Sequence, residues 1–221
     1  MDTSHKKFRI GSLVMVFCVM VTGIFFYIFI LMPQKQYYKA HHVNIQGTYL
    51  IKPITLKPFK CMDHFNKKFN LDNLRNRWTF IFFGFAHCKN ICPSTLTALN
   101  STLFILNKNF SNYFLPQVVF ITVDPKRDTL GYLHEFICKF NPNFIGARAT
   151  TGQKALEENM HVFTSKGTAD DNGYTINHSA ELVLINPDAK IQAYFSYPVN
   201  PTQLAKEYML TVNKYQTMKG K

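Results

Sequence analysis

The chain has 221 residues, of which 47% are hydrophobic, 15% aromatic and 17% charged. At roughly 150 residues per domain, this length accommodates one domain with an appendage, or two small domains. The composition excludes an intrinsically disordered chain, a collagen and a coiled coil, and the slightly negative mean hydropathy excludes a multi-span channel. The formal net charge of +12 favours acidic partners, but it does not distinguish a protein face, lipid headgroups and nucleic acid.

The first expected element is one N-terminal transmembrane helix over residues 10–32. These 23 residues carry no charge, and at 1.5 Å per residue they would form about 35 Å of helix, enough to cross a hydrocarbon core of ~30 Å. Lys6, Lys7 and Arg9 precede the helix, so the positive-inside rule keeps residues 1–9 in the cytoplasm. A cleaved signal peptide would have a shorter apolar core followed by a small-x-small site. We therefore expect a single-pass anchor in a bacterial inner membrane, with the C-terminal domain in the periplasm.

The remainder of the chain is expected to form one domain. A polar linker is predicted over residues 33–45, the domain over residues 46–216, and a short tail over residues 217–221. The continuous apolar run at residues 78–85 is typical of a central strand that is buried on both faces.

Apolar residues at a spacing of three and four follow Pro93 and predict an amphipathic helix: Leu96, Leu99, Leu103, Leu106 and Phe110. The later elements, in chain order, are a buried strand at 118–123, helices at 129–140 and 152–162, a turn at Asn172-Gly173, strands at 181–185 and 190–195, and a helix from Pro201 to about Tyr215. This order predicts an α/β fold, in which a central mixed sheet is flanked by helices.

The main chemical signal is the cysteine pair Cys88 and Cys92, at the junction of the first buried strand and its helix. In the first turn of a helix, unpaired N–H groups and the positive end of the helix dipole favour the thiolate over the thiol. Lys89 adds a nearby cation, and Pro93 fits the first turn because its missing N–H costs nothing there. Thioredoxin-type folds keep their reactive thiols at this junction.

Three uses of the pair remain open from these residues alone. Two thiolates can exchange with a disulfide, although redox pairs most often have the C-x-x-C spacing. The wider spacing of Cys88 and Cys92 eases chelation of a soft ion such as Cu(I). The third use is structural, as two buried and inert cysteines.

Several ordered motifs resemble those of the Sco/SenC family, whose members are membrane-anchored, thioredoxin-like copper-binding proteins. Residues 83–93 resemble the family's F-G-F-T-H-C-P-x-x-C-P segment, and residues 120–129 resemble its V-D-P-x-R-D-T segment. Residues 144–146 match an F-x-G, and Asn177-His178-Ser179 falls where the family has D-H-S. The resemblance covers about residues 63–215.

The resemblance implies that Cys88, Cys92 and His178 bind copper as Cu(I), with Cu(II) left open. It implies a copper chaperone rather than an enzyme. The partner would be cytochrome c oxidase subunit II, or a similar copper-site protein, whose dinuclear copper site receives the metal during assembly. Asp124 and the nearby Arg127 and Asp128 would support the site or the fold without contacting copper.

Asn177 departs from the family pattern, because it replaces an aspartate and so removes a carboxylate that could tune the imidazole or the bound metal. The alternative function is a thiol–disulfide oxidoreductase that reduces the cysteines of a copper-site apoprotein and uses Cys88 and Cys92 without His178. A peroxide-handling thiol enzyme would need one cysteine far more acidic than the other, with an arginine close to it. The sequence carries no nucleic-acid-binding motif and does not define the oligomeric state.

The remaining candidate residues have plainer interpretations. His87 is expected to pack beside the cysteine pair or to tune the pKa of the neighbouring Cys88 thiol. We expect the other histidines of helical or turn segments, His64, His134 and His161, on the surface. A disulfide between Cys61 and Cys138 is a hypothesis for an oxidising compartment.

Overall fold

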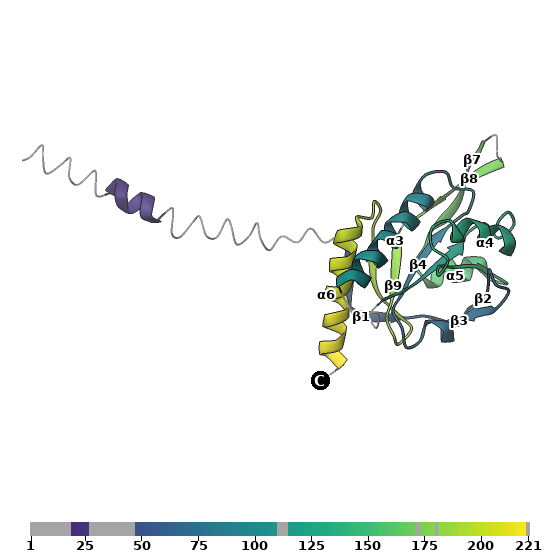
Figure 1. The fold of residues 1–221 in the computed structure, drawn as a ribbon, viewed down its shortest axis with the longest axis horizontal. Coiled ribbons are helices and arrows are strands. Elements are labelled where there is room, and N and C mark those ends of the chain that lie inside the picture. The colour runs from purple at the N-terminus through teal and green to yellow at the C-terminus, as the bar shows by residue number, and fades with distance from the viewer. Residues whose placement is uncertain (1–18, 27–46, 110–114, 171–172, 180, 220–221) are drawn as a thin grey trace, which may run out of the picture. The chain divides into compact units, whose positions relative to one another are not determined.

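The computed structural model describes residues 19–26, 47–109, 115–170, 173–179 and 181–219 (Figure 1). The chain divides into two units, residues 1–44 and 45–221. In the first unit, residues 19–26 form an exposed helix. No helix within the described residues is both long and apolar enough to cross a membrane. Most of the expected anchor, with the linker that follows it, lies outside the described residues.

The second unit is built on an eight-stranded mixed sheet with the strand order β1-β10-β9-β4-β5-β6-β2-β3. Strands β4, β5 and β6 run parallel, and the other neighbouring strands pair antiparallel. The bounds of the strands in this sheet are β1 (Gly47–Thr55), β2 (Lys60–Asp63), β3 (Lys68–Asn70), β4 (Thr79–Gly84), β5 (Gln117–Thr122), β6 (Ile145–Ala149), β9 (Leu182–Ile185) and β10 (Lys190–Phe195).

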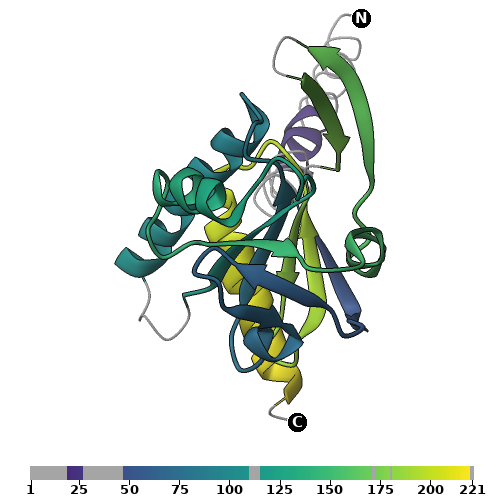
Figure 2. The ribbon, with the colours of Figure 1, turned by 90° about the vertical axis from the view of Figure 1, so that its right-hand side faces the viewer.

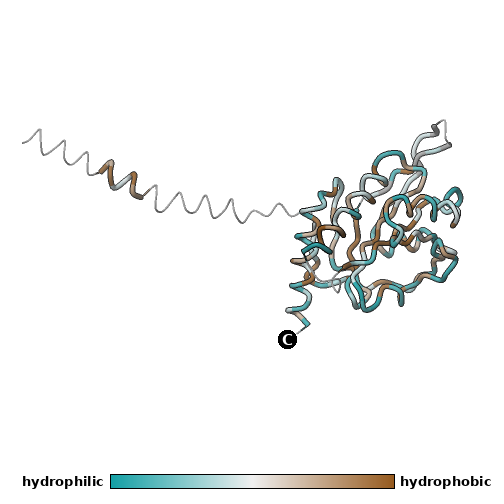
Figure 3. Tube along the Cα trace, in the orientation of Figure 1, coloured by the Kyte–Doolittle hydropathy of each residue, from teal (hydrophilic) through white to brown (hydrophobic). Residues whose placement is uncertain are grey.

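The central strand β4 confirms the prediction from the apolar run at 78–85. All six of its residues are buried, because β5 and β9 pair with its two edges and side chains cover both of its faces. Figure 3 shows hydrophobic stretches of the trace along the sheet, with hydrophilic stretches in the loops and on the outer helices. The cysteine pair therefore follows a rigid strand in the middle of the sheet.

Helices cover both faces of the sheet (Figures 1 and 2). The core on one face includes side chains from α3 (Ile91–Asn109), α4 (Leu130–Cys138) and α6 (Pro201–Lys219). The opposite core includes Leu156 of α5 (Gln153–Asn159), together with residues of the loop after β1 and of the 3-10 helix η2 (Leu71–Leu74). The predicted α/β fold is thus confirmed as a three-layer arrangement.

The helix boundaries differ in detail from the prediction. Thr129 caps α4, since its side-chain oxygen accepts a hydrogen bond from the Tyr132 N–H at 3.2 Å. Helix α6 continues past Tyr215 to Lys219. Asp188 holds this last turn, because it accepts hydrogen bonds from the Tyr215 hydroxyl at 2.9 Å and from Lys219 Nζ at 2.6 Å.

A separate hairpin formed by β7 (Thr164–Asp170) and β8 (Gly173–His178) projects from the body of the domain (Figures 1 and 2). Its two strands pair with each other as a two-stranded sheet and are not part of the main sheet. The sequence predicted a turn here but not the strands. The hairpin bears on the predicted copper site because its last residue is His178.

Candidate metal and redox site

Cys88 and Cys92 lie where β4 leads into α3, as the sequence predicted. Cys92 is in the first turn of α3, and its side chain is fully buried in the core, whereas Cys88 is half-buried in the preceding loop. Gly84 at the end of β4 makes this arrangement possible. A Cβ atom on Gly84 would lie 2.8 Å from Cys92 Sγ and 2.7 Å from the Phe120 ring, so a side chain there would displace the buried sulfur.

Backbone hydrogen bonds fix the two sulfurs relative to each other. The Cys92 N–H donates to Cys88 Sγ at 3.5 Å, and the Cys88 N–H donates to the Phe85 carbonyl at 3.1 Å. Cys88 is therefore held against the N-terminus of α3, and no disulfide joins the two cysteines. This geometry brings the two expected soft donors together.

The two thiols differ strongly in acidity. A hydrogen bond from the Cys92 thiol, supported by the backbone N–H groups of Cys92, Asn90 and Ile91, holds the pKa of Cys88 well below its usual value. That same hydrogen bond, together with burial and the neighbouring Cys88 charge, raises the pKa of Cys92. The pair therefore consists of an accessible thiolate and a buried thiol that donates to it.

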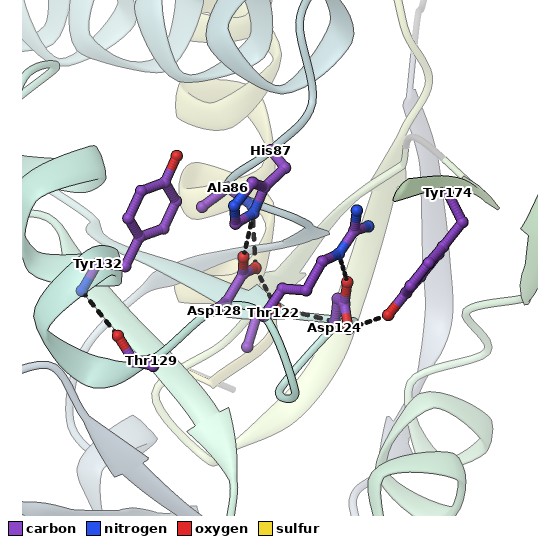
Figure 4. A network of polar contacts seen from close by, with 9 residues as sticks. Ala86, His87, Thr122, Asp124, Asp128, Thr129, Tyr132 and Tyr174 are labelled. Carbon is purple, nitrogen blue, oxygen red and sulfur yellow. Dashed lines mark hydrogen bonds and ion pairs between the residues drawn. The ribbon is translucent and has the colours of Figure 1, made fainter. Parts of the chain in front are cut away.

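Asp128 ties the cysteine loop to the start of α4 (Figure 4). Its buried carboxylate accepts hydrogen bonds from the Ala86 N–H at 2.9 Å and from the Thr122 hydroxyl at 2.5 Å, and His87 Nδ1 lies 3.0 Å from its second oxygen. The His87 ring also stacks on Tyr132 of α4 at 4.6 Å. Asp128 thus supports the loop that carries Cys88, and His87 packs beside the site.

Asp124, Arg127 and Tyr174 form a second cluster of polar contacts near the site. Arg127 forms an ion pair with Asp124 and stacks on the ring of Tyr174, with its guanidinium carbon 3.8 Å from the ring centroid. The Tyr174 hydroxyl donates to the other Asp124 oxygen at 2.8 Å. Asp124 and Arg127 are thus held by each other and by Tyr174, a partner that the sequence did not reveal.

His178 is the last residue of β8, and its backbone pairs with Thr164. Its side chain lies outside the described part of the structure, so its role as a copper ligand stays a prediction. Asn177 is exposed and pairs with Ser165. Within the described residues, no group of three or more His, Cys, Asp or Glu side chains is placed to hold a metal ion. The cysteine pair supplies two donors of the soft class that Cu(I) prefers.

The prediction that His64 lies on the surface is wrong. Only 7% of His64 is exposed, because Nδ1 accepts a hydrogen bond from the Gly146 N–H at 2.9 Å and the ring packs against Phe65. His134 and His161 are exposed, as expected.

Cys61 and Cys138 are free thiols, so the disulfide hypothesis is not supported. Cys61 packs into the core on the α5 side of the sheet, whereas α4, which ends at Cys138, packs on the opposite side. The sheet therefore separates the two residues.

A cysteine pair at the junction of a central strand and its helix, in an α/β sandwich, is the arrangement of a thioredoxin-like protein. A model of the SCO1/SenC family matches residues 49–212. This chain belongs to the SCO1/SenC family.

Curated relatives are 28–36% identical to this chain over the aligned residues. "Protein SCO2 homolog, mitochondrial" of Danio rerio is 34% identical over 174 residues, which are 76% of this chain and 61% of the relative. "SCO2-like protein" of Rickettsia felis is 36% identical over 149 residues, 66% of this chain and 71% of the relative. "Protein SCO1 homolog 1, mitochondrial" of Arabidopsis thaliana is 28% identical, and the match spans 47% of its length. The chain thus spans less than two thirds of the length of each of these two mitochondrial relatives.

Solved structures of the same fold include proteins with copper bound. Arabidopsis thaliana ScoI with copper bound has a TM-score of 0.68 at 27% identity, covering 72% of this chain and 99% of that chain. Yeast Sco1 with copper bound has a TM-score of 0.66 at 26% identity, covering 73% of this chain and 90% of that chain. Bound copper is a property of those relatives.

Proposed function

We propose that this protein is a copper chaperone that binds Cu(I) through Cys88, Cys92 and His178. It delivers the ion to the dinuclear copper site of cytochrome c oxidase subunit II, or of a similar protein, during assembly. On this proposal the protein is a binding protein rather than an enzyme. Residues 10–32 anchor it in a bacterial inner membrane, and the domain faces the periplasm.

The observation that carries this proposal is the state of Cys88. A half-buried sulfur with a lowered pKa, at a helix N-terminus and 3.5 Å from the N–H of a second cysteine, is a ready donor for a soft cation. Cys92 must give up its proton to donate as well. A cation between the two sulfurs favours that loss, since metal binding competes with protons for thiolates. The copper-bound relatives of similar fold support copper as the bound ion.

His178 is proposed as the third donor because two thiolates leave room for an imidazole, and because β8 ends at this residue. Copper is cargo in this scheme, so the site must also release it. A donor on a hairpin that is not part of the main sheet can leave the metal without disturbing the core. Formation of a Cys88–Cys92 disulfide removes both thiolates, so binding depends on the redox state.

A competition titration of the reduced, anaerobic full-length chain in mild detergent tests the proposal. Cu(I) is titrated against a chromogenic chelator for the wild type, Cys88→Ala, Cys92→Ala and His178→Ala. The matched controls are Cys138→Ala and His134→Ala, which remove an accessible thiol and an exposed imidazole elsewhere in the fold. We expect one tight copper per chain, weakened in the three site variants alone. Tight binding that survives in His178→Ala would remove the histidine from the ligand set.

The acidity difference between the cysteines also favours a second function, reduction of a partner disulfide. The Cys88 thiolate would attack one partner sulfur, forming a mixed disulfide and releasing the other partner sulfur as a thiolate. Cys92 would then lose its proton and attack Cys88, which leaves an intramolecular disulfide and a partner reduced by two electrons. Absence of tight copper in the titration, together with turnover of a partner disulfide, would establish this function instead.

The acidity difference would equally suit a peroxide-handling thiol. That chemistry also requires an arginine beside the reactive sulfur. Arg127 is instead engaged by Asp124 and by the aromatic rings of Phe85 and Tyr174. The geometry therefore favours copper binding or disulfide exchange.

A further inference from the structure

The hairpin that ends at His178 needs side-chain contacts to hold its position, because its strands are not part of the main sheet. One contact is at its base, where Lys154 of α5 donates to the Thr164 carbonyl at 3.1 Å and the Thr164 hydroxyl donates to Glu157 at 2.6 Å. The second contact is made by Tyr174, which lies on β8 itself.

Four residues form this second contact, which we call the Arg127 clamp: Phe85, Asp124, Arg127 and Tyr174. The guanidinium carbon of Arg127 lies 3.8 Å from the centroid of the Tyr174 ring and 5.8 Å from that of the Phe85 ring. Asp124 binds both Arg127 and the Tyr174 hydroxyl. Figure 4 shows Tyr174 reaching from the hairpin toward Asp124. One guanidinium thus contacts two aromatic rings that are 89 positions apart in the sequence.

Each of the two rings lies on a segment that also carries proposed copper ligands. Phe85 is in the cysteine loop, and its carbonyl accepts the hydrogen bond from the Cys88 N–H at 3.1 Å. Tyr174 is four residues before His178 on the same strand. The clamp therefore connects the segment that carries the cysteines to the strand that carries the histidine.

We propose that Arg127 and Tyr174 are positioning residues that hold the β7–β8 hairpin where His178 can join Cys88 and Cys92 in binding copper. This inference rests on the function proposed above. The clamp acts through the hairpin and has no contact with the metal. The guanidinium is planar and lies over the Tyr174 ring while its Nε binds Asp124, and a compact lysine ammonium has no plane to stack on the ring.

Hydrogen–deuterium exchange of the reduced, metal-free full-length chain tests whether the clamp holds the hairpin. The variants are Tyr174→Ala, Tyr174→Phe and Arg127→Lys, and the control is Phe104→Ala, which removes a 71% exposed ring from α3. We expect Tyr174→Ala to speed exchange of the β7–β8 amides about tenfold, while the amides of β4 and β5 keep their wild-type rates. Tyr174→Phe keeps the stacked ring and loses only the bond to Asp124, so a smaller increase is expected. Unchanged exchange in β7–β8 for Tyr174→Ala would overturn the clamp.

Copper titration of the same variants tests whether the position of the β7–β8 hairpin affects Cu(I) binding. Tyr174→Ala should weaken Cu(I) binding by the same factor as His178→Ala, and the double variant should lose no more than either single variant. A full additive loss in the double variant would overturn the positioning role. If the wild type binds no copper, the proposed function fails. The exchange measurement on the metal-free protein then still decides whether Arg127 and Tyr174 hold the hairpin.

Discussion

The Cys92 N–H points at the Cys88 sulfur across 3.5 Å, so the start of α3 acts on the thiol one turn before it. The contact makes the two cysteines chemically unequal, although both belong to one short motif. Cys88 is exposed enough to meet a metal ion or a partner, and Cys92 is closed into the core.

Cys88 should react first with a small alkylating agent, and it should do so at a lower pH than an ordinary thiol. Its pKa is lowered by the Cys92 thiol and the α3 amides, so the thiolate persists in mildly acidic solution. Mass spectrometry of reduced protein after short iodoacetamide pulses at pH 6 and pH 8 measures this. The expected result is rapid labelling of Cys88 at both pH values and slow labelling of Cys92. Cys88 labelling that rises steeply from pH 6 to pH 8 would contradict the lowered pKa.

Gly84→Ala should destabilise the reduced protein by about 2–3 kcal/mol, because the new methyl group would overlap Cys92 Sγ and the Phe120 ring. Gly131→Ala is the matched control, since a Cβ there meets nothing within 4 Å. In the helix α4 that control should be neutral, or stabilising by up to about 1 kcal/mol. Urea unfolding measures both free energies. Equal stability of the two variants would show that the strand end is not tightly packed against the buried cysteine.

Asp128→Asn should lower the free energy of unfolding by about 2–3 kcal/mol. The Asp128 Oδ2 atom accepts from both the Ala86 N–H and the Thr122 hydroxyl, and a neutral amide oxygen in its place would accept only the weaker, uncharged form of the two bonds. Asp72→Asn is the control, because the Asp72 side chain is 81% exposed and its ion pair with Arg75 lies on the surface. Denaturant titration of the two variants should separate them clearly. A loss no larger than that of the control would mean that Asp128 does not hold the cysteine loop.

Alkaline pH should lower the free energy of unfolding of the reduced protein, in part because the Cys61 thiol is buried. Burial raises the pKa of this thiol to about 12, so the folded state keeps it neutral while the unfolded chain ionises near pH 8.5. The stabilisation is complete below pH 8.5 and is lost as the pH rises toward 12, with a slope of up to about 1.4 kcal/mol per pH unit. Unfolding free energies of the wild type and Cys61→Ala between pH 7.5 and pH 10.5 measure the effect. The variant should show the shallower decline, and identical slopes would contradict burial of the thiol.

The core strand and the cysteine pair could be predicted because their signals are local. The run that became β4 is continuous and apolar, and the positions of Cys88, Cys92 and Pro93 relative to the helix follow from neighbouring residues. Thr129 caps α4 through a local bond from the Tyr132 N–H. Its neighbour Asp128 turned instead toward Ala86, 42 residues earlier, and this contact cannot be read from periodicity.

The features that the sequence did not reveal depend on contacts between distant segments. His64 is buried because the Gly146 N–H, 82 residues later, satisfies its ring nitrogen. Tyr174 has no motif of its own, and its place in the Arg127 clamp required the hairpin to fold back over Asp124. The β1 strand was missed because it pairs only with β10 and has a half-exposed pattern without clean alternation.

X-ray absorption at the copper edge, on the reduced full-length chain loaded with one Cu(I), tests the central claim most directly. The account predicts a first shell of two sulfur atoms and one imidazole nitrogen. It also predicts that His178→Ala loses the imidazole signal and keeps both sulfurs. A wild-type shell of sulfur alone, or one that is unchanged in His178→Ala, would contradict the three-ligand site.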